Sequence, residues 1–435
     1  MNVARYVRLG AALSLIAAGT SFAQGLSPAK PEQVGMSAQR LARVSEVLKQ
    51  EVEQGRLPGA VVMVARKGKV VYTDAFGFQD PAAKTPMRAD TVFRIYSMTK
   101  PLVSVALMQL VEDGRVQLTD PVSKFLPAFK GQTVSVAQVD QATARVTYTR
   151  VPVAREMTIQ DLLRHTSGLA YGEITQNAPV KDAYTKAGMF KPGFDFEARD
   201  MKPQEQVERV GAAPLAHQPG STWEYSVAVD IQGRVVEAVT GKRLADYMQE
   251  RVFGPLKMAD TAFWLPGDRM GRLANSFDKD PASGLPNKLI DVSAPPGNDS
   301  GGAGAVSTAA DYLRFCQAML NGGQLDGARI LSRSTVKLMT SDHLGPRIAT
   351  PMQPGELLLG TQGYTFGLGF AVRQGDGIAG VAGSAGEFMW AGYAGTYFWA
   401  DPKEELCGVY MTQAPSPIRA YYRRMFKNLV YQALD

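Results

Sequence analysis

The sequence contains few of the side chains that bind metal ions or form disulfides. Among its 435 residues there are three histidines, His165, His217 and His343, and two cysteines. The histidines lie far apart, and neither an H-E-x-x-H nor a C-x-x-C pattern occurs. A zinc site of the common types is therefore not expected, so a hydrolytic enzyme with this sequence would work without a metal ion.

Long apolar runs are missing beyond the first residues. No later stretch reaches the roughly 18 uninterrupted apolar residues that a membrane-spanning helix needs. The first residues contain Arg5 and Arg8, then the apolar run Leu9–Ala18, and small side chains up to Ala23. This layout is typical of a secretory signal peptide, so we predict that residues 1–23 are removed by cleavage after Ala23. We expect the mature chain to be periplasmic or secreted, with no stable membrane anchor.

Clusters of positive charge are absent as well. The 47 Lys and Arg residues and the 41 Asp and Glu residues give a net charge of +6 at pH 7, but the basic residues are dispersed along the chain. Without a basic run or a nucleic-acid-binding motif, we do not expect a nucleic-acid partner. The sequence leaves the oligomeric state open.

The two cysteines occupy apolar patterns. Cys316 lies on an apolar helical face and Cys407 in an alternating, strand-like run. Both positions suit buried thiols, which behave as small hydrophobic side chains. Export to an oxidising compartment also permits a disulfide between them, so both states remain open.

The hydrophobic periodicity predicts an α/β fold with strands near both ends of the chain. Apolar residues at helical spacing predict helices at 38–54, 101–112, 159–164, 308–320 and 421–434. Runs rich in β-branched and aromatic residues predict strands at 60–65, 70–76, 364–373, 387–390, 396–399 and 406–412. The mature chain, 24–435, is too long for one core, because single cores stop growing at about 250–300 residues. We expect one two-lobed unit, with an α/β lobe of about 24–115 and 296–435 and an inserted helix-rich lobe of about 116–295.

A serine and a lysine at S-x-x-K spacing are the best source of chemistry in a chain with so few histidines. Residues at i and i+3 share a helix face, so the lysine amine can lie beside the serine hydroxyl. The pattern occurs four times, at Ser27/Lys30, Ser97/Lys100, Ser276/Lys279 and Ser334/Lys337. The serines at 27, 276 and 334 lie in polar or flexible surroundings, where a serine before a helix is usually a cap.

The second of these patterns has a different context. Ser97 follows the apolar run Val92–Tyr96 and opens the most apolar helix of the chain. A lysine held there loses the solvation of its charged form, which lowers its pKa and makes a proton-accepting amine accessible. Ser97 is therefore the predicted nucleophile and Lys100 its base. A helix cap followed by a lysine that extends to solvent also satisfies the pattern.

The surrounding residues carry a family resemblance. The stretch Phe93–Pro101 resembles the nucleophile motif of the serine β-lactamase-related hydrolases, which include class C β-lactamases, penicillin-binding DD-peptidases and family VIII carboxylesterases. Leu162–Leu169, Pro219–Ser226, Pro255–Met258 and Gly301–Gly304 agree in order and spacing. The resemblance implies the β-lactamase/DD-peptidase-like fold, an antiparallel sheet flanked by helices with a helix-rich lobe inserted. No G-x-S-x-G pattern occurs, which argues against the α/β-hydrolase fold.

The family's second motif, Tyr-x-Asn, corresponds to Tyr225-Ser226-Val227. The resemblance implies that the phenol of Tyr225 accepts the serine proton and passes it to the leaving group. A nearby lysine ammonium would favour the phenolate form. A buried tyrosine bonded to the backbone is the alternative. Val227 stands where the family has an asparagine that contacts a substrate amide, so that contact is not expected.

The third motif of β-lactamases, Lys-Thr-Gly, is missing. The corresponding segment, Glu387–Thr396, resembles the Trp-Gly-Gly type of family VIII esterases. The absent lysine would engage a substrate carboxylate, whereas Trp390 suits an apolar acyl or alcohol group, or simple core packing. Gly392 permits close approach of a ligand to the backbone. The family pattern implies an oxyanion hole formed by the N–H groups of Ser97 and Tyr393.

These observations together predict an exported serine carboxylesterase that cleaves a small-molecule ester through an acyl-enzyme on Ser97, with no cofactor. The nearest alternative is amide chemistry, as in a β-lactamase or DD-peptidase, which Val227 and the missing lysine disfavour. A non-catalytic ligand-binding relative of the same fold is the other alternative. The presence of Ser97, Lys100 and Tyr225 together disfavours it.

Overall fold

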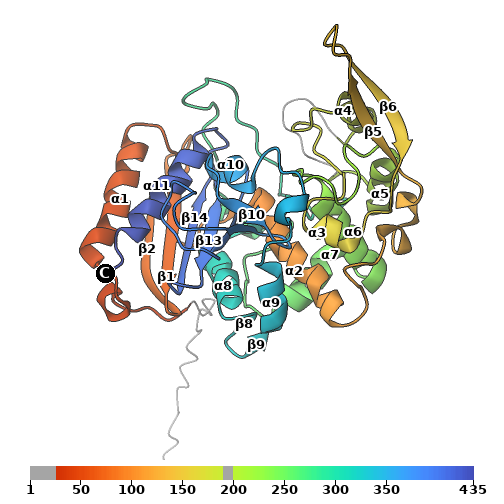
Figure 1. Ribbon diagram of the computed structural model, residues 1–435. Helices are drawn as coiled ribbons and strands as arrows, with labels where there is room; N and C mark the ends of the chain where they lie inside the picture. The colour runs from red at the N-terminus through yellow and green to blue at the C-terminus, as the bar shows by residue number, and fades with distance from the viewer. Residues whose placement is uncertain (1–25, 190–198) are drawn as a thin grey trace, which may run out of the picture.

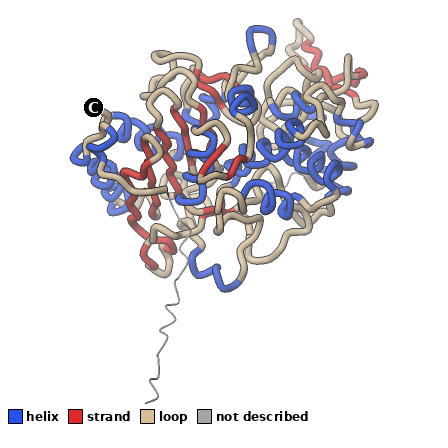
Figure 2. Tube along the Cα trace, turned by 90° about the horizontal axis from the view of Figure 1, so that it is seen from below, coloured by secondary structure: helices blue, strands red, loops and turns tan. Residues whose placement is uncertain are grey.

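A sheet-containing lobe lies beside a mostly helical lobe in the computed structural model, which describes residues 26–189 and 199–435 (Figure 1). The expected signal peptide, residues 1–23, lies outside the described residues. Among the helices that are described, none combines the length and apolar character required to cross a bilayer. Seen from below, most of the strands gather in one half of the molecule and many of the helices in the other (Figure 2).

The large sheet brings the two ends of the chain together. Its strand order is β10-β11-β12-β13-β14-β1-β2-β3, and each neighbouring pair is antiparallel. The strands are β1 Gly59–Arg66, β2 Lys69–Asp80, β3 Thr85–Pro86, β10 Tyr364–Phe366, β11 Ala371–Arg373, β12 Phe388–Ala391, β13 Tyr397–Asp401 and β14 Leu406–Thr412. β14 pairs with β1 over seven residues, from Ala60↔Thr412 to Arg66↔Leu406. The predicted antiparallel sheet, built from both ends of the sequence, is confirmed.

Helices cover both faces of this sheet. The helices of the chain are α1 Ala38–Glu53, α2 Thr99–Glu112, α3 Ile159–Leu163, α4 Ala178–Lys186, α5 Pro203–Ala212, α6 Ala228–Thr240, α7 Leu244–Met248, α8 Ala309–Leu320, α9 Arg333–Met339, α10 Pro354–Leu359 and α11 Arg419–Tyr431. α1 and α11 pack together on one side, and α8 packs against β1, β13 and β14 from the other (Figure 1). Thr308 caps α8 by accepting a hydrogen bond from the Asp311 N–H, as its position before the helix predicts.

α2 connects the sheet to the helical lobe. Every residue from Thr99 to Leu110 is buried, and the helix packs on α6 and α7. A helix that is apolar all round requires neighbours on every side, and burial of each large aliphatic side chain contributes about 1.5–3 kcal/mol. The beginning of α2 therefore lies deep between the lobes.

Two regions differ from the sequence prediction. The run 364–373, expected as one strand, is divided into β10 and β11 by a turn in which Gly369 has φ +96°. A Cβ atom at Gly367 would lie 2.0 Å from the Met339 carbonyl oxygen, so this turn also needs close backbone approach. The helical lobe carries an unpredicted hairpin, β5 Thr133–Val139 and β6 Val146–Pro152, which projects from it (Figure 1). Much of this hairpin is exposed, so an alternating apolar face is weak there.

The two cysteines are buried, free thiols. Cys316 comes from α8 and Cys407 from β14. Burial raises the pKa of the Cys316 thiol, and the neighbouring Cys407 adds to this effect. The structure therefore shows the reduced alternative. Both side chains form part of the hydrophobic core.

A buried ion pair joins β12 to α11. Lys427 of α11 contacts Glu387 at the beginning of β12, and both side chains are fully buried. The Tyr364 and Tyr431 hydroxyls donate hydrogen bonds to the same carboxylate. Burial lowers the pKa of Lys427, and the Glu387 carboxylate opposes that effect.

Removal of Lys427 alone should lower the stability of the protein more than removal of both charges of the Lys427–Glu387 pair. Lys427→Met leaves the buried Glu387 carboxylate without its closest cation, with Arg373 at 3.9 Å as the remaining one, and we expect the free energy of unfolding to fall by about 3–5 kcal/mol. The double variant with Glu387→Gln should recover part of this loss. Urea denaturation followed by circular dichroism measures both. Lys403→Met, which removes one partner of an exposed pair with Asp376, is the control and should change stability by less than about 0.5 kcal/mol.

Candidate active site

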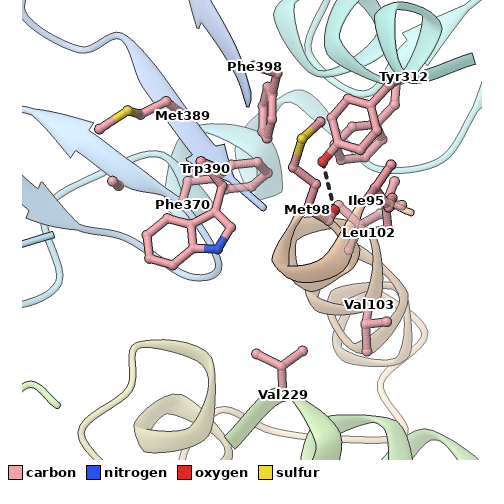
Figure 3. Close-up of a cluster of buried hydrophobic side chains, with 14 of the residues drawn as sticks. Ile95, Met98, Leu102, Val103, Val229, Tyr312, Phe370, Met389, Trp390 and Phe398 are labelled. Carbon is pink, nitrogen blue, oxygen red and sulfur yellow. Dashed lines mark hydrogen bonds between the residues drawn. The ribbon is translucent and has the colours of Figure 1, made fainter. Parts of the chain in front are cut away.

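The predicted nucleophile, Ser97, lies in a short 3-10 turn, Tyr96–Met98, between β4 (Phe93–Arg94) and α2. Tyr96, immediately before it, has the left-handed φ of 44°, which is unfavourable for a tyrosine. Contacts hold this turn on both sides: the Tyr96 hydroxyl accepts a hydrogen bond from the Ile290 N–H at 2.9 Å, and the Tyr312 hydroxyl of α8 donates to the Met98 carbonyl at 2.8 Å (Figure 3). The turn presents the Ser97 side chain to a cavity.

Lys100 follows Ser97 by three residues, in the first turn of α2, and is 1% exposed. Its Nζ is 3.3 Å from Ser97 Oγ, 2.9 Å from the Tyr171 hydroxyl and 2.7 Å from the Gly302 carbonyl oxygen. The close approach of this carbonyl depends on glycine, because a Cβ atom on Gly302 would lie 2.3 Å from Asp230 Oδ2. The Gly301–Gly304 segment therefore provides a hydrogen-bond acceptor for the Lys100 amine.

Burial changes the protonation of this lysine. Desolvation lowers the pKa of Lys100 to about 7, with the nearby Asp230 carboxylate opposing the shift. A neutral amine has two N–H donors and one lone pair. The Gly302 carbonyl and the Tyr171 oxygen are placed to receive the two N–H groups, which leaves the lone pair for the Ser97 hydroxyl. This arrangement suits a base.

The third predicted residue, Tyr225, contacts the nucleophile directly. Its hydroxyl donates to Ser97 Oγ at 2.7 Å, and the Lys100 Nζ lies 4.7 Å from its ring centroid. The ring is packed against other rings with centroid separations of 5.1 Å to Tyr171, 5.2 Å to His165 and 5.5 Å to Trp390. Ser97, Lys100 and Tyr225 are thus brought together, as the sequence motifs predict.

The expected ionisation of Tyr225 is wrong for the resting site. We expected the lysine ammonium to favour a phenolate. Burial is the largest influence and raises the pKa of Tyr225, and the hydrogen bond to Ser97 opposes this only in part. Tyr225 is therefore a neutral phenol at neutral pH, and of the two groups Lys100 is the one that can accept a proton there.

Tyr171 was not predicted. It follows the Leu162–Leu169 motif and accepts the Lys100 hydrogen bond, and burial raises the pKa of its own phenol. No spacing pattern in the sequence relates Tyr171 to the lysine, because the two are 71 residues apart. His165 was set aside as part of a structural helix end. It has φ +56°. Its Nδ1 lies 3.0 Å from Ser226 Oγ, and its ring packs against the ring of Tyr225.

A cavity of about 200 Å³ opens in front of Ser97. It is lined by Tyr96, Ser97, Tyr171, Glu173, Ile174, Tyr225, Ala303, Leu357, Leu358, Ala391, Gly392, Tyr393, Arg419 and Arg423. A second cavity of about 360 Å³ shares Ile174 and Tyr225 with it. Within the described part of the chain, no three His, Cys, Asp or Glu side chains cluster as metal ligands would.

Gly392 and Tyr393 both line the cavity in front of Ser97, and Gly392 also has a packing role. A Cβ atom on Gly392 would be 2.3 Å from the Ile95 carbonyl oxygen and 2.2 Å from Thr396 Oγ1. Gly392 therefore lets the end of β12 pack against the backbone that leads to Ser97. Tyr393 lines the same cavity as Ser97, and its ring meets Tyr96 edge-on at 5.4 Å.

Trp390 does not line the cavity. The sequence suggested contact with an apolar substrate group or core packing, and the structure shows core packing: Trp390 is fully buried behind Tyr225 and also contacts Phe366 at 5.3 Å. Figure 3 shows it among the buried side chains around Met98 and Phe370. Val227, in place of the family's asparagine, is also buried, 7% exposed, and is not part of the cavity lining.

The other three S-x-x-K patterns have no comparable surroundings. Lys30, Lys279 and Lys337 are exposed, whereas Lys100 is buried. Ser27 accepts a hydrogen bond from Lys69 at 2.9 Å, and Ser334 is bonded to Ser332 at the surface. Burial of the lysine therefore distinguishes the Ser97 pattern from the rest.

The pattern that defines the beta-lactamase family matches residues 44–429 of this chain. The chain belongs to the beta-lactamase family. It is 32% identical over 384 residues to the esterase EstB of Burkholderia gladioli, covering 84% of this chain and 88% of EstB.

Two solved structures have a similar fold. The hydrolase EstCE1, described as having promiscuous acyltransferase activity, superimposes with a TM-score of 0.74 and 28% identity, covering 90% of this chain and 99% of EstCE1. Simvastatin synthase from Aspergillus terreus superimposes with a TM-score of 0.74 and 25% identity, covering 91% and 98%.

The reactivity of Ser97 in this beta-lactamase family member should follow the titration of Lys100. Because we expect the neutral Lys100 amine to be the base, the rate of labelling by a fluorophosphonate should rise with pH through about 7. Asp230→Asn removes the charge that raises the pKa of Lys100, so its profile should move to lower pH. Labelling rates measured from pH 5 to 9 test both; an unshifted profile in Asp230→Asn would contradict the assignment.

Trp390 should act through Tyr225 rather than through contact with a ligand. Trp390→Leu removes one wall of the Tyr225 packing, and we expect the maximal rate of fluorophosphonate labelling to fall at least about tenfold, with an unchanged half-saturating concentration. Trp399→Leu is the matched control, since Trp399 is equally buried but stacks on Tyr397 and Tyr431. A change confined to the half-saturating concentration would instead indicate ligand contact.

Proposed function

We propose that this beta-lactamase family member is a serine carboxylesterase that forms an acyl-enzyme on Ser97. The observation that carries the proposal is the convergence of a buried lysine and a tyrosine phenol on one serine oxygen, at 3.3 Å and 2.7 Å, at the wall of a cavity. Similarity to the esterase EstB and to the hydrolase EstCE1 supports ester chemistry.

In the acylation step, the neutral Lys100 amine takes the Ser97 proton as Oγ attacks the ester carbonyl carbon. The product is a tetrahedral intermediate with a negative oxygen and a lysine ammonium. We assign the backbone N–H groups of Ser97 and Tyr393 to this oxygen, since both residues line the cavity.

Collapse of the intermediate requires a proton on the departing alcohol. The neutral Tyr225 phenol supplies it, because its raised pKa keeps the proton available at neutral pH. The phenolate formed lies beside the Lys100 ammonium, and return of the lysine proton to the phenolate restores both groups. Water then enters where the alcohol was, gives a proton to the neutral Lys100 amine and attacks the acyl carbon. Tyr225 gives its proton to Ser97 Oγ as the bond from Oγ to the acyl carbon breaks, the acid is released, and the lysine proton returns to the Tyr225 phenolate.

Two features of the sequence disfavour amide substrates of the β-lactam and D-alanyl type. Val227 offers no amide to the cavity, and the strand-edge segment 390–392 carries no lysine. We also propose that the protein acts outside the cytoplasm, on the support of the signal-peptide pattern in residues 1–23.

Removal of each reacting group should suppress ester hydrolysis. Ser97→Ala and Lys100→Met should lower kcat/KM for 4-nitrophenyl butyrate by at least about 10³-fold, and Tyr225→Phe by about 10²–10⁴-fold. Ser334→Ala, which alters an exposed S-x-x-K serine, should retain full activity. Intact-mass spectrometry should show the acyl group on wild-type protein and none on Ser97→Ala. Wild-type rates in Ser97→Ala would sink the proposal.

Ester and amide chemistry can be separated on one sample. The wild-type protein should hydrolyse 4-nitrophenyl butyrate with a kcat/KM at least about 100-fold above that for nitrocefin. The reason is that the chain lacks the lysine of the Lys-Thr-Gly motif, which would bind the β-lactam carboxylate. A preference for nitrocefin would instead assign the protein to β-lactam hydrolysis. Failure of fluorophosphonate to label Ser97, with neither substrate turned over, would identify a non-catalytic relative.

A further inference from the structure

Residues 265–292 form a long segment, which we call the strap, beside the strand that leads to Ser97. A hydrogen bond of 2.7 Å from the N–H of its first residue to the carbonyl of its last residue closes the strap. Two backbone hydrogen bonds of 2.8 Å join it to Val92: the Val92 N–H donates to the Arg272 carbonyl, and the Ala274 N–H donates to the Val92 carbonyl. The strap is therefore attached to the chain shortly before the nucleophile.

Ile290 of the strap is held through both of its backbone polar groups. Its carbonyl accepts a hydrogen bond from Arg94 Nε at 2.6 Å, and its N–H donates to the Tyr96 hydroxyl at 2.9 Å. Arg94 is buried and also donates to the Ala274 carbonyl at 2.8 Å. Both side chains belong to the residues directly before Ser97, so the strap and the nucleophile turn are joined at that point.

A small hydrophobic cluster, separate from the main core, packs between the strap and the active site. Its buried members are Leu265, Leu273, Ile290 and Val292 of the strap with Val92, Tyr96, Val306 and Ala394, and the partly buried Tyr393 packs against them. Three parts of the chain meet in this cluster: the strap, the residue before Ser97, and the turn that follows β12. Tyr96 and Tyr393 also line the cavity, so the cluster forms the back of one cavity wall.

Tyr96 is linked to both N–H groups of the oxyanion hole that we assign. The Ser97 N–H belongs to the peptide that follows Tyr96, so the backbone dihedrals of Tyr96 set its direction. The φ of Tyr96 is +44°, a conformation that a tyrosine keeps only where its surroundings enforce it. On the other side, the Tyr96 ring meets the Tyr393 ring edge-on at 5.4 Å.

We propose that Tyr96, anchored to Ile290 of the strap, is a positioning residue that fixes the two oxyanion-hole N–H groups relative to each other. This inference rests on the proposed esterase function and adds a residue that acts through the backbone of Ser97 and Tyr393. Preorganised donors stabilise the tetrahedral oxygen because they do not rearrange as its charge develops. Loss of the anchor should therefore weaken binding of the tetrahedral state more than binding of an unreacted ligand.

A matched pair of ketones separates the oxyanion hole from the rest of the cavity. Ser97 Oγ adds to the carbonyl carbon of 1,1,1-trifluoroheptan-2-one, and the adduct has a negative oxygen like that of the tetrahedral intermediate. Heptan-2-one has the same carbon chain and forms no stable adduct. The Ki of heptan-2-one divided by the Ki of the trifluoroketone therefore measures stabilisation of that oxygen in wild type and variants.

Tyr96→Phe removes the hydroxyl that binds Ile290 and keeps the ring. We expect the ratio of Ki values and the kcat/KM for 4-nitrophenyl butyrate each to fall at least about tenfold, with the Ki of heptan-2-one within about twofold of wild type. The midpoint of the pH profile of fluorophosphonate labelling should not move, because burial and the Asp230 carboxylate set the pKa of Lys100.

Tyr96→Gly is the second variant. Glycine adopts a positive φ without strain, so this change keeps the backbone conformation accessible while it removes the contacts with Ile290 and Tyr393. We expect its ratio to fall at least as far as that of Tyr96→Phe. Tyr247→Phe is the matched control, because Tyr247 of α7 is equally buried and its hydroxyl has no hydrogen-bond partner among the described residues. Its ratio should match wild type.

A wild-type ratio in Tyr96→Phe or Tyr96→Gly, or an equal loss of affinity for both ketones in folded protein, would overturn the positioning role while leaving the esterase assignment intact. Absence of ester hydrolysis by wild-type protein, together with an unlabelled Ser97, would overturn the proposed function itself. The two failures are therefore distinguishable.

Discussion

The proposed mechanism depends on keeping the Lys100 amine away from water. An exposed lysine is almost wholly protonated at neutral pH, whereas the buried Lys100 has a pKa of about 7. That burial requires α2 to be enclosed on every side, and it requires Gly302 to bring its carbonyl to the amine without a side chain in the way. The Asp230 carboxylate moderates the shift, so the amine stays close to the pH at which it can both accept and return a proton.

The second constraint is the position of the Tyr225 hydroxyl. The ring is held by Tyr171 and His165 from the helical lobe and by Trp390 from the sheet, so both lobes are needed to aim it at Ser97. Gly392 brings the same strand end against the backbone before the nucleophile, and α11 reaches the cavity through Arg423, which binds the Gly392 carbonyl. The site is therefore assembled from segments that span most of the chain, and the match to the family, residues 44–429, covers all of them.

Prediction from the sequence succeeded where local pattern and burial coincide. α1, α8 and the strand pair β1–β2 follow directly from periodicity, and Ser97 stands out among four similar patterns because its surroundings are apolar. Prediction failed where contacts between residues distant in the sequence determine the local structure. The run 364–373 has strand composition throughout, but the approach of Gly367 to the Met339 carbonyl forces a turn within it. Local sequence did not distinguish contact of Trp390 with a substrate from packing in the core. Its position behind Tyr225 depends on how the sheet packs against the helical lobe.

By itself, the sequence determined the reacting groups: a serine at the start of an apolar helix, a lysine one turn later, and a tyrosine within a recognisable motif. The tertiary structure alone decided their protonation and their neighbours. The pKa of a group depends on the solvent and charges around it, and those come from segments distant in the chain. Burial lowers the pKa of Lys100 and raises that of Tyr225 only because distant segments, including Tyr171, Gly302 and Asp230, surround them. The shortage of histidine is consistent with this site, because the base that we propose is a desolvated lysine and not an imidazole.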